Sequence, residues 1–463
     1  MHNKIYDYEQ VMEKLNQLVQ NSIITEEKDI GKTKYGLPIK HYSIGKGKKS
    51  VVISSATHGC EIISTDFVLK LMEEMSKRTP RFNKIDFNKY KFHFIPILNP
   101  EGYLISTSAI RAKIPIKMPE EEAEKICKEY YQQYKNDDIQ ATARRKQGLE
   151  PDRTSVKLHQ KLFEDVDYTC IPKKYKEIRE KIKSIYEKYP DLPVGMLQAW
   201  SANADGIDIQ ANCILNDKIR QIEDGDKIYK DDLRHSNIDI SHPGPINVPY
   251  DKEVGFEKTR EVKAIEGLLE ELQQSGELVS YYNYHSTGGM IYQRPASFIG
   301  KIDGKYFNID KKIVENYLLA KIYSEKTYKN ASDKSNSRYA VQRSNLKLSS
   351  SNDLFRIKYP EDFLIEISGM GGNPLGPYGD IQGNYNSLMK SNLDAFAYSI
   401  KLREIANIVS NSAFSAFENL QKKSDNEEEV QNRYEILDVI FQEFMNQVEN
   451  LKSREEEENS LDK

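Results

Sequence analysis

A single stretch near the N-terminus constrains the fold of this chain more than any other part of it. The apolar run 51–53 predicts a buried strand, the spacing of apolar residues over 62–75 predicts a helix, and residues 92–98 predict a second strand. A strand, a helix and a strand within about 45 residues form a βαβ unit, which places its two strands parallel in one sheet. We therefore predict an α/β fold with a mainly parallel sheet covered by helices on both faces.

The rest of the chain adds elements to this unit. The patterns predict an amphipathic helix within residues 1–20, an edge strand at 39–44, a helix at 259–272 and strands at 278–284 and 363–367. Charged helical stretches within residues 114–190 predict a helical insertion that lies over the main sheet. From residue 403 the pattern indicates a helical, acidic extension, so we divide the chain into a main domain, 1–402, and an extension, 403–463.

Charge, hydropathy and cysteine content limit what the protein can be. Its 463 residues contain 67 Lys and Arg and 71 Asp and Glu, a net charge of −4 without a basic stripe, so we expect no nucleic-acid partner. No apolar run is long enough for a membrane span, so we expect no membrane partner. The first residues lack the apolar core of a secretory signal, and the four cysteines form no disulfide framework, so we expect cytoplasmic residence.

Two segments carry a histidine where a predicted strand ends. In Ser54–Glu61, His58 and Glu61 lie three residues apart at the start of the predicted helix, so both can reach one cation. In Asn283–Gly289, His285 follows an aromatic strand. Two histidines and a glutamate would supply the three protein ligands of a catalytic zinc site, which leaves one position for water. The alternatives are a surface histidine beside a helix-start glutamate, and a core or loop histidine.

A carboxylate lies inside a third apolar run. Glu366 belongs to the predicted strand 363–367, and an unpaired buried carboxylate is costly, so Glu366 needs a partner. That partner is either an arginine or lysine, or a zinc-bound water for which Glu366 is the general base.

Two further features lie close to these segments. The turn Asn99–Gly102 ends a strand, and we assign it a structural role rather than chemistry. Cys60 and Cys213 lie in site-forming segments, where a thiolate can ligate zinc, although small buried cysteines are more common.

Five short elements, in the same order along the chain, resemble those of the zinc carboxypeptidase family (M14, the funnelins). The elements are His58 with Glu61, residues 96–103 (PILNPEGY), residues 203–213 (NADGIDIQANC), residues 284–286 (YHS) and residues 364–368 (LIEIS). Each element is weak alone, but five in order make a chance match very unlikely, and they cover the chain from about residue 5 to residue 402.

The resemblance implies a fold, a cofactor and a set of roles. The fold would be a mixed, mainly parallel eight-stranded sheet sandwiched by helices, and residues 1–402 would be the catalytic domain. One Zn²⁺ would be held by His58, Glu61 and His285. Glu366 would take a proton from the zinc-bound water and pass it to the leaving amine. Asp208 would orient His58, and its alternative is a turn or capping aspartate.

The substrate side departs from the family pattern. By the resemblance, Ser286, Gln210 and Asn212 would contact the peptide, but Gln210 and Ala211 replace the family's Asn-Arg pair that holds a terminal carboxylate. No arginine lies near Trp200, and the family's tyrosine is absent near Asn345, with Tyr339 the nearest. Five arginines are either substitutes for the missing anchor or surface residues: Arg111, Arg294, Arg338, Arg343 and Arg356.

One subgroup of the family tolerates such changes. Residues 200–208, 285–289 and 353–355 resemble bacterial γ-D-glutamyl-meso-diaminopimelate peptidases, which cleave cell-wall stem peptides. The sequence is therefore interpreted as a zinc metallopeptidase acting on muropeptide-like or other unusual peptides. The alternatives are an ordinary metallocarboxypeptidase with a relocated carboxylate anchor, and a non-catalytic peptide-binding relative.

Overall fold

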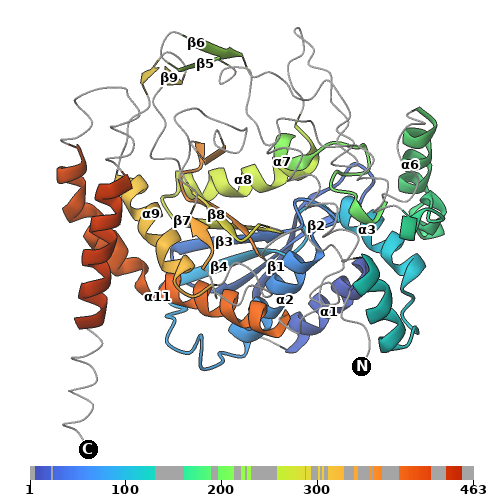
Figure 1. The fold of residues 1–463 in the computed structure, drawn as a ribbon, viewed down its shortest axis with the longest axis horizontal. Coiled ribbons are helices and arrows are strands. Elements are labelled where there is room, and N and C mark those ends of the chain that lie inside the picture. Colours follow the sequence, from blue (N-terminus) through green and yellow to red (C-terminus); the bar gives the residue numbers. More distant parts are fainter. Residues whose placement is uncertain are drawn as a thin grey trace, which may run out of the picture.

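The computed structural model describes most of the chain outside the longer loops. The described residues are 6–21, 24–130, 161–188, 197–212, 221–224, 227–230, 258–286, 288–293, 301–302, 305–306, 311–327, 338–341, 355–356, 358–367, 385–418 and 434–450. They form an eight-stranded sheet with helices around it (Figure 1), which confirms the predicted fold class. Within these residues, no helix combines the length and the apolar character that a membrane span requires.

The sheet is mixed, and its centre is parallel. Its strands, in spatial order, are β1 Ile24–Lys32, β2 Pro38–Gly45, β4 Tyr90–Ile95, β3 Lys49–Ser55, β7 Leu278–His285, β12 Asp362–Glu366, β8 Met290–Tyr292 and β11 Ala340–Val341. The four central strands β4, β3, β7 and β12 run parallel to one another. Their carboxyl ends therefore lie along one edge of the sheet, where α/β proteins place their ligand sites. A second, four-stranded sheet consists of β5 Gln221–Asp224, β6 Lys227–Lys230, β9 Lys301–Ile302 and β10 Lys305–Tyr306.

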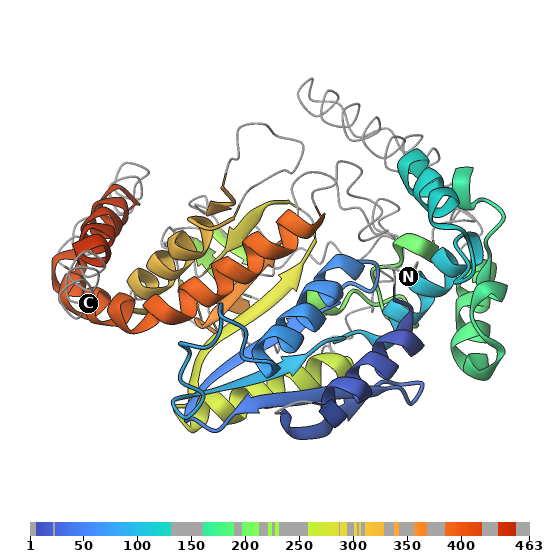
Figure 2. The same cartoon turned by 90° about the horizontal axis from the view of Figure 1, so that it is seen from below.

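Helices cover both faces of the main sheet (Figure 2). They are α1 Tyr8–Asn21, α2 Ile62–Ser76, α3 Pro100–Lys113, α8 Arg260–Gln274, α9 Lys311–Ser324 and α11 Tyr385–Glu418. Two apolar cores result, because alternate strand residues point to opposite faces. Val51 and Ile53 belong to the larger core, with α2, α9 and α11, whereas Val52 belongs to the smaller core beneath α8. The βαβ unit predicted from residues 51–98 is therefore present as β3, α2 and β4.

Two details of the sequence interpretation are wrong. Strand β2, which contains residues 39–44, is not an edge strand, because β1 pairs with its outer side. The described part of the insertion does not lie over the sheet. Its helices, residues 120–130 and α6 Lys176–Lys188, lie beyond α3 at one end of the molecule (Figures 1 and 2).

The predicted helical C-terminal region is confirmed. Helix α11 runs without a break across residue 402, where the sequence interpretation ends the catalytic domain, and that division stays a prediction. A second helix, residues 434–450, buries four apolar side chains: Leu437, Phe441, Phe444 and Val448. It packs against α9, where the Tyr317 hydroxyl donates to Asp438 Oδ1 over 2.6 Å and the Tyr317 and Tyr434 ring centroids lie 5.9 Å apart.

Candidate metal centre

Parallel pairing brings the two predicted histidine segments together. His58 lies in the loop between β3 and α2, and Glu61 immediately precedes α2. His285 is the last residue of β7, which pairs in parallel with β3. Both segments therefore leave the sheet at the same edge.

The three side chains face one another. His58 Nδ1 lies 2.8 Å from Glu61 Oε1, and His285 Nδ1 lies 2.9 Å from Glu61 Oε2. One donor atom from each residue lies within 4.8 Å of the other two. The two imidazole rings meet edge to face, with centroids 5.0 Å apart. The geometry thus gathers two nitrogens and a carboxylate around one small volume.

Unsatisfied polar atoms at this place fit a bound cation. The His285 side chain is fully buried. Apart from the 2.9 Å contact between His285 Nδ1 and Glu61 Oε2, neither ring nitrogen nor this oxygen has a hydrogen-bond partner among the described residues. Buried polar atoms are rarely left in this state. Two imidazoles and one carboxylate form a donor set used by catalytic zinc sites, so the residues present fit Zn²⁺. Burial alone would raise the pKa of Glu61, but the two histidines outweigh it and lower that pKa, which favours the carboxylate form.

Asp208 combines the two roles considered for it. Its Oδ1 lies 3.3 Å from His58 Nε2, the imidazole nitrogen that points away from Glu61. The same oxygen accepts the backbone N–H of Gln210 over 2.9 Å, at the start of the short helix α7 Ile209–Asn212. The bond to Gln210 therefore holds the Asp208 carboxylate beside His58.

Glu366 lies next to the cluster. It ends β12, and the sheet register places it beside His285. Backbone hydrogen bonds fix this edge: Gly289 N donates to Glu366 O, and Ile367 N donates to His285 O. No lysine or arginine among the described residues forms an ion pair with Glu366. Burial, followed by the charge of Glu61, raises its pKa to about 7, in the range of a general acid–base group.

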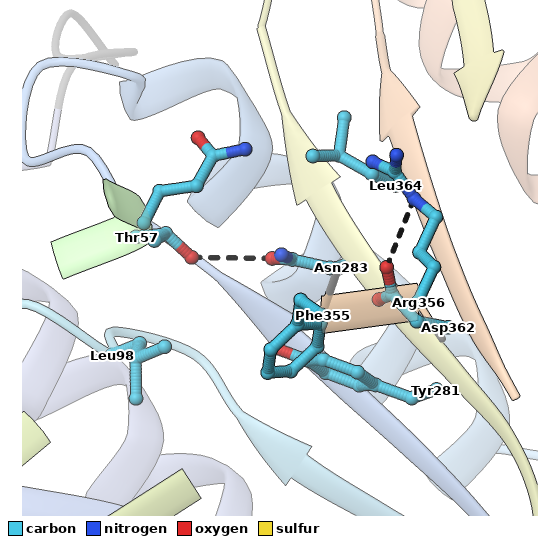
Figure 3. A pocket seen from close by; sticks show the side chains of 9 residues that line it. Thr57, Leu98, Tyr281, Asn283, Phe355, Arg356, Asp362 and Leu364 are labelled. Carbon is cyan, nitrogen blue, oxygen red and sulfur yellow. Dashed lines mark hydrogen bonds and ion pairs between the residues drawn. The ribbon is translucent and has the colours of Figure 1, made fainter. Parts of the chain in front are cut away.

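A small pocket, partly open to solvent, lies beside these groups (Figure 3). Thr57, Asn283 and Leu364 line it, and they precede His58, His285 and Glu366 by one, two and two residues. Strand residues two apart share a face, so the pocket and the cluster lie on the same side of β7 and β12. The Thr57 hydroxyl donates to Asn283 Oδ1 over 3.1 Å.

The pocket holds a buried ion pair that the sequence did not indicate as a unit. Arg356 is 1% exposed, and its Nε lies 3.3 Å from Asp362 Oδ2 (Figure 3). Burial raises the pKa of Asp362 to about 7, against the opposing effect of Arg356. Arg356 lies six residues before Asp362, the first residue of β12. No short motif marks the two residues as a pair.

Of the other predicted substrate-side residues that the structure describes, one lines the pocket. Gln210 lines the pocket. Ser286 follows His285 directly and is partly exposed, and Asn212 ends α7. Arg111 and Arg338 do not line this pocket, because they bond to Gln10 Oε1 and Glu325 Oε1 elsewhere. Arg294, Arg343, Asn345 and Cys213 lie outside the described residues.

Two other candidates from the sequence, Cys60 and Tyr339, are not part of the donor group. The donor group among the described residues contains no cysteine sulfur, and burial raises the pKa of the Cys60 thiol, which disfavours the thiolate. The Tyr339 side chain is buried, and its hydroxyl accepts from Asn392 Nδ2 in α11. Tyr339 is therefore a core residue of the α9–α11 side.

Comparison with known families confirms the predicted resemblance. Residues 8–153 match the model of the zinc carboxypeptidase family, peptidase M14. This N-terminal part of the chain is therefore similar to the zinc carboxypeptidase family. The match includes His58 and Glu61 and ends before Asp208, His285 and Glu366. A search of curated proteins found no match.

Solved metallocarboxypeptidases are among the structures similar to this chain. Bovine thrombin-activatable fibrinolysis inhibitor, solved with a tick carboxypeptidase inhibitor, aligns with a TM-score of 0.48 and 13% identity over 87% of this chain and 98% of its own. Carboxypeptidase A from Helicoverpa armigera gives 0.46 and 12% over 89% and 75%. The murein-tripeptide amidase MpaA from Escherichia coli O157 gives 0.33 and 10% over 80% and 94%.

Proposed function

We propose that this protein is a zinc-dependent metallopeptidase that hydrolyses cell-wall stem peptides or similarly unusual peptides. His58, Glu61 and His285 would hold one Zn²⁺, and Glu366 would be the general base. The observation that carries the proposal is the convergence of these three donors beside Glu366 at the carboxyl edge of parallel strands.

The roles of the side chains follow from their positions. When bound, zinc lowers the pKa of a coordinated water and polarises the scissile carbonyl. Glu366, which lies beside His285, would receive the proton of the attacking water and deliver it to the leaving amine. Asp208 holds the tautomer of His58 in which Nδ1 carries the lone pair, because its carboxylate accepts the proton on Nε2.

The ion pair in the pocket supports the substrate class. A plain hydrophobic side chain gains nothing from Arg356 and Asp362, which would remain buried without a new partner. A side chain that ends in both an amino and a carboxylate group can pair with each of them. The free end of meso-diaminopimelate in stem peptides has this chemistry, and the resemblance of residues 200–208 to the γ-D-glutamyl-meso-diaminopimelate peptidases agrees with it.

Hydrolysis of defined peptides tests this function. L-Ala-γ-D-Glu-meso-diaminopimelate peptides should be cleaved, and the matched peptides with lysine in place of diaminopimelate should be cleaved more slowly, because lysine lacks the second carboxylate. Glu366→Gln is the control for catalysis by this site. Faster cleavage of plain C-terminal peptides would identify an ordinary metallocarboxypeptidase, and binding of peptides without any hydrolysis would identify a non-catalytic relative.

A further inference from the structure

Three loops from distant parts of the sequence meet behind His58. The first, residues 55–61, carries His58. The second, residues 96–102, includes the first turn of α3, and the third, residues 200–208, ends at Asp208. We refer to this meeting point as the loop junction. The 3.3 Å distance between His58 and Asp208 spans the first and third loops, so it depends on how the junction holds them.

Asn99 is at the centre of the loop junction and is completely buried. Its Oδ1 accepts the backbone N–H of Gly102 over 2.9 Å and caps α3. Its Nδ2 donates to Thr57 O and to Ser201 O, each over 3.2 Å. One amide group therefore bonds to the residue before His58 and to the loop that leads to Asp208.

Glu101 ties the third loop from the other side. Its fully buried carboxylate accepts the backbone N–H of Ala204 over 3.1 Å and that of Tyr35 over 3.0 Å. Asp205, next along this loop, accepts from Lys34 Nζ and the Tyr35 hydroxyl. Glu101 thus fixes the loop four residues before Asp208.

Two glycines bring the loops into direct backbone contact. Gly59 N donates to Ser201 O over 3.1 Å, and a Cβ on Gly59 would lie 2.1 Å from the Gly102 carbonyl carbon. A Cβ on Gly102 would lie 2.3 Å from Ala202 O. Such distances exclude any side chain at either position, so the three backbones are in contact with no space between them.

We propose that Asn99 and Glu101 are positioning residues for the metal centre: they hold the His58 loop and the Asp208 loop at the separation at which Asp208 orients the His58 imidazole. The role rests on the proposed zinc function. The turn Asn99–Gly102 therefore does more than cap α3. Its side chains bond to the loop that carries His58 and to the loop that carries Asp208.

Zinc affinity, measured by competition with a chromogenic chelator on the full-length protein, tests the role. Asn99→Asp keeps the cap on Gly102 but loses both Nδ2–H donors, and Glu101→Gln keeps the shape but loses one acceptor. Both variants should weaken zinc binding by about 10-fold, at the low end of the range for groups that orient a ligand. Their kcat should fall while KM stays unchanged.

Ser106→Ala is the matched control. The buried Ser106 hydroxyl donates to Gln198 O over 2.6 Å, just before the third loop. It forms no bond to the loop that carries His58. This variant should unfold at a lower temperature yet bind zinc as the wild type does. Asp208→Ala is the positive control and should weaken zinc binding by about 10- to 100-fold.

The outcomes separate the two proposals. Wild-type zinc affinity in both Asn99→Asp and Glu101→Gln, alongside weakened binding in Asp208→Ala, would overturn the positioning role and leave the proposed function intact. A wild-type protein that binds no zinc would overturn the proposed function and the positioning role with it. If Asn99→Asp does not fold, Glu101→Gln decides the question by the same measurement.

Discussion

Two pairs of histidines lie close together in this protein, and their surroundings differ. His58 and His285 have ring centroids 5.0 Å apart at the edge of the sheet, and His41 and His93 have centroids 5.1 Å apart between β2 and β4. In the second pair, His41 Nε2 and His93 Nδ1 are 2.9 Å apart, and His93 Nε2 lies 3.2 Å from Ser50 Oγ. Three of the four ring nitrogens of this second pair, the inner pair, therefore have a partner, whereas His41 Nδ1 has none among the described residues.

Carboxylates make the difference between the pairs. Burial alone would lower the pKa of His58, but Glu61 and Asp208 outweigh it and raise that pKa well above its usual value. No carboxylate among the described residues bonds to the inner pair, and burial lowers the pKa of His41 to about 4 and that of His93 to about 3. The carboxylate of Glu61, which lies between His58 and His285, therefore distinguishes the proposed metal site from the inner pair.

Removal of one histidine from each pair should give the largest contrast. We expect His285→Ala to lose stoichiometric zinc binding and all hydrolysis, because two protein donors remain at the cluster. His93→Gln should keep both, because the inner pair lies away from the cluster. Metal analysis of the purified variants measures this, and equal zinc content in the two would remove the distinction between the pairs.

Removal of the base should separate chemistry from metal binding. For Glu366→Gln we expect kcat to fall by about 10²- to 10⁴-fold, the usual contribution of a general acid–base group, while zinc content stays at the wild-type value. Steady-state kinetics with metal analysis checks both. Full turnover in this variant would assign the proton transfers to another group.

Removal of the pocket ion pair should change substrate choice. The double variant Arg356→Met with Asp362→Asn removes both charges of the pair, and we expect kcat/KM for diaminopimelate stem peptides to fall by about 10- to 100-fold, as for loss of charge-assisted hydrogen bonds. Cleavage of the matched lysine peptides should change less. Arg338→Met, at a pair with Glu325 outside the pocket, is the control. An equal loss for both peptides would exclude specific recognition by the pair.

The inner pair should affect stability rather than activity. Its histidines have folded-state pKa values below the ordinary 6.5, so the unfolded chain binds more protons between these values. The stabilisation is present above about pH 6.5 and is lost as pH falls towards 4, on the order of a few kcal/mol. Denaturant unfolding from pH 7.5 to 4.5 should show a shallower pH dependence in the double variant His41→Gln with His93→Gln. Parallel slopes would show that other groups titrate.

The sequence predicted the elements whose signal is local. Residues 51–53 and 62–75 appear as β3 and α2 because continuous apolar runs and helical spacing need no tertiary information. The sequence analysis missed β1, because its charged residues, ITEEKDIGK, alternate with few apolar ones at an exposed edge. It also missed β8 and β11, which span three and two residues and exist only through pairing.

The candidate site divides in the same way. His58, Glu61, His285 and Glu366 stand out in their local sequence at strand ends or inside an apolar run, and the family resemblance added Asp208 and implied a role for each residue. The pocket could not be predicted, because Thr57, Asn283 and Leu364 become neighbours only through the order of the strands. The same holds for Asn99, whose bonds to Thr57 and Ser201 join residues 42 and 102 positions away.

The rung of β7 and β12 that pairs His285 with Glu366 has a consequence for how such a protein can change. A slip of one residue between these strands would turn the side chain of Glu366 to the opposite surface, so the backbone ladder permits only one alignment of the two groups. Loops around this rung can lengthen, shorten or exchange side chains without disturbing its spacing. New specificities can therefore arise at the periphery while the reacting pair is inherited intact.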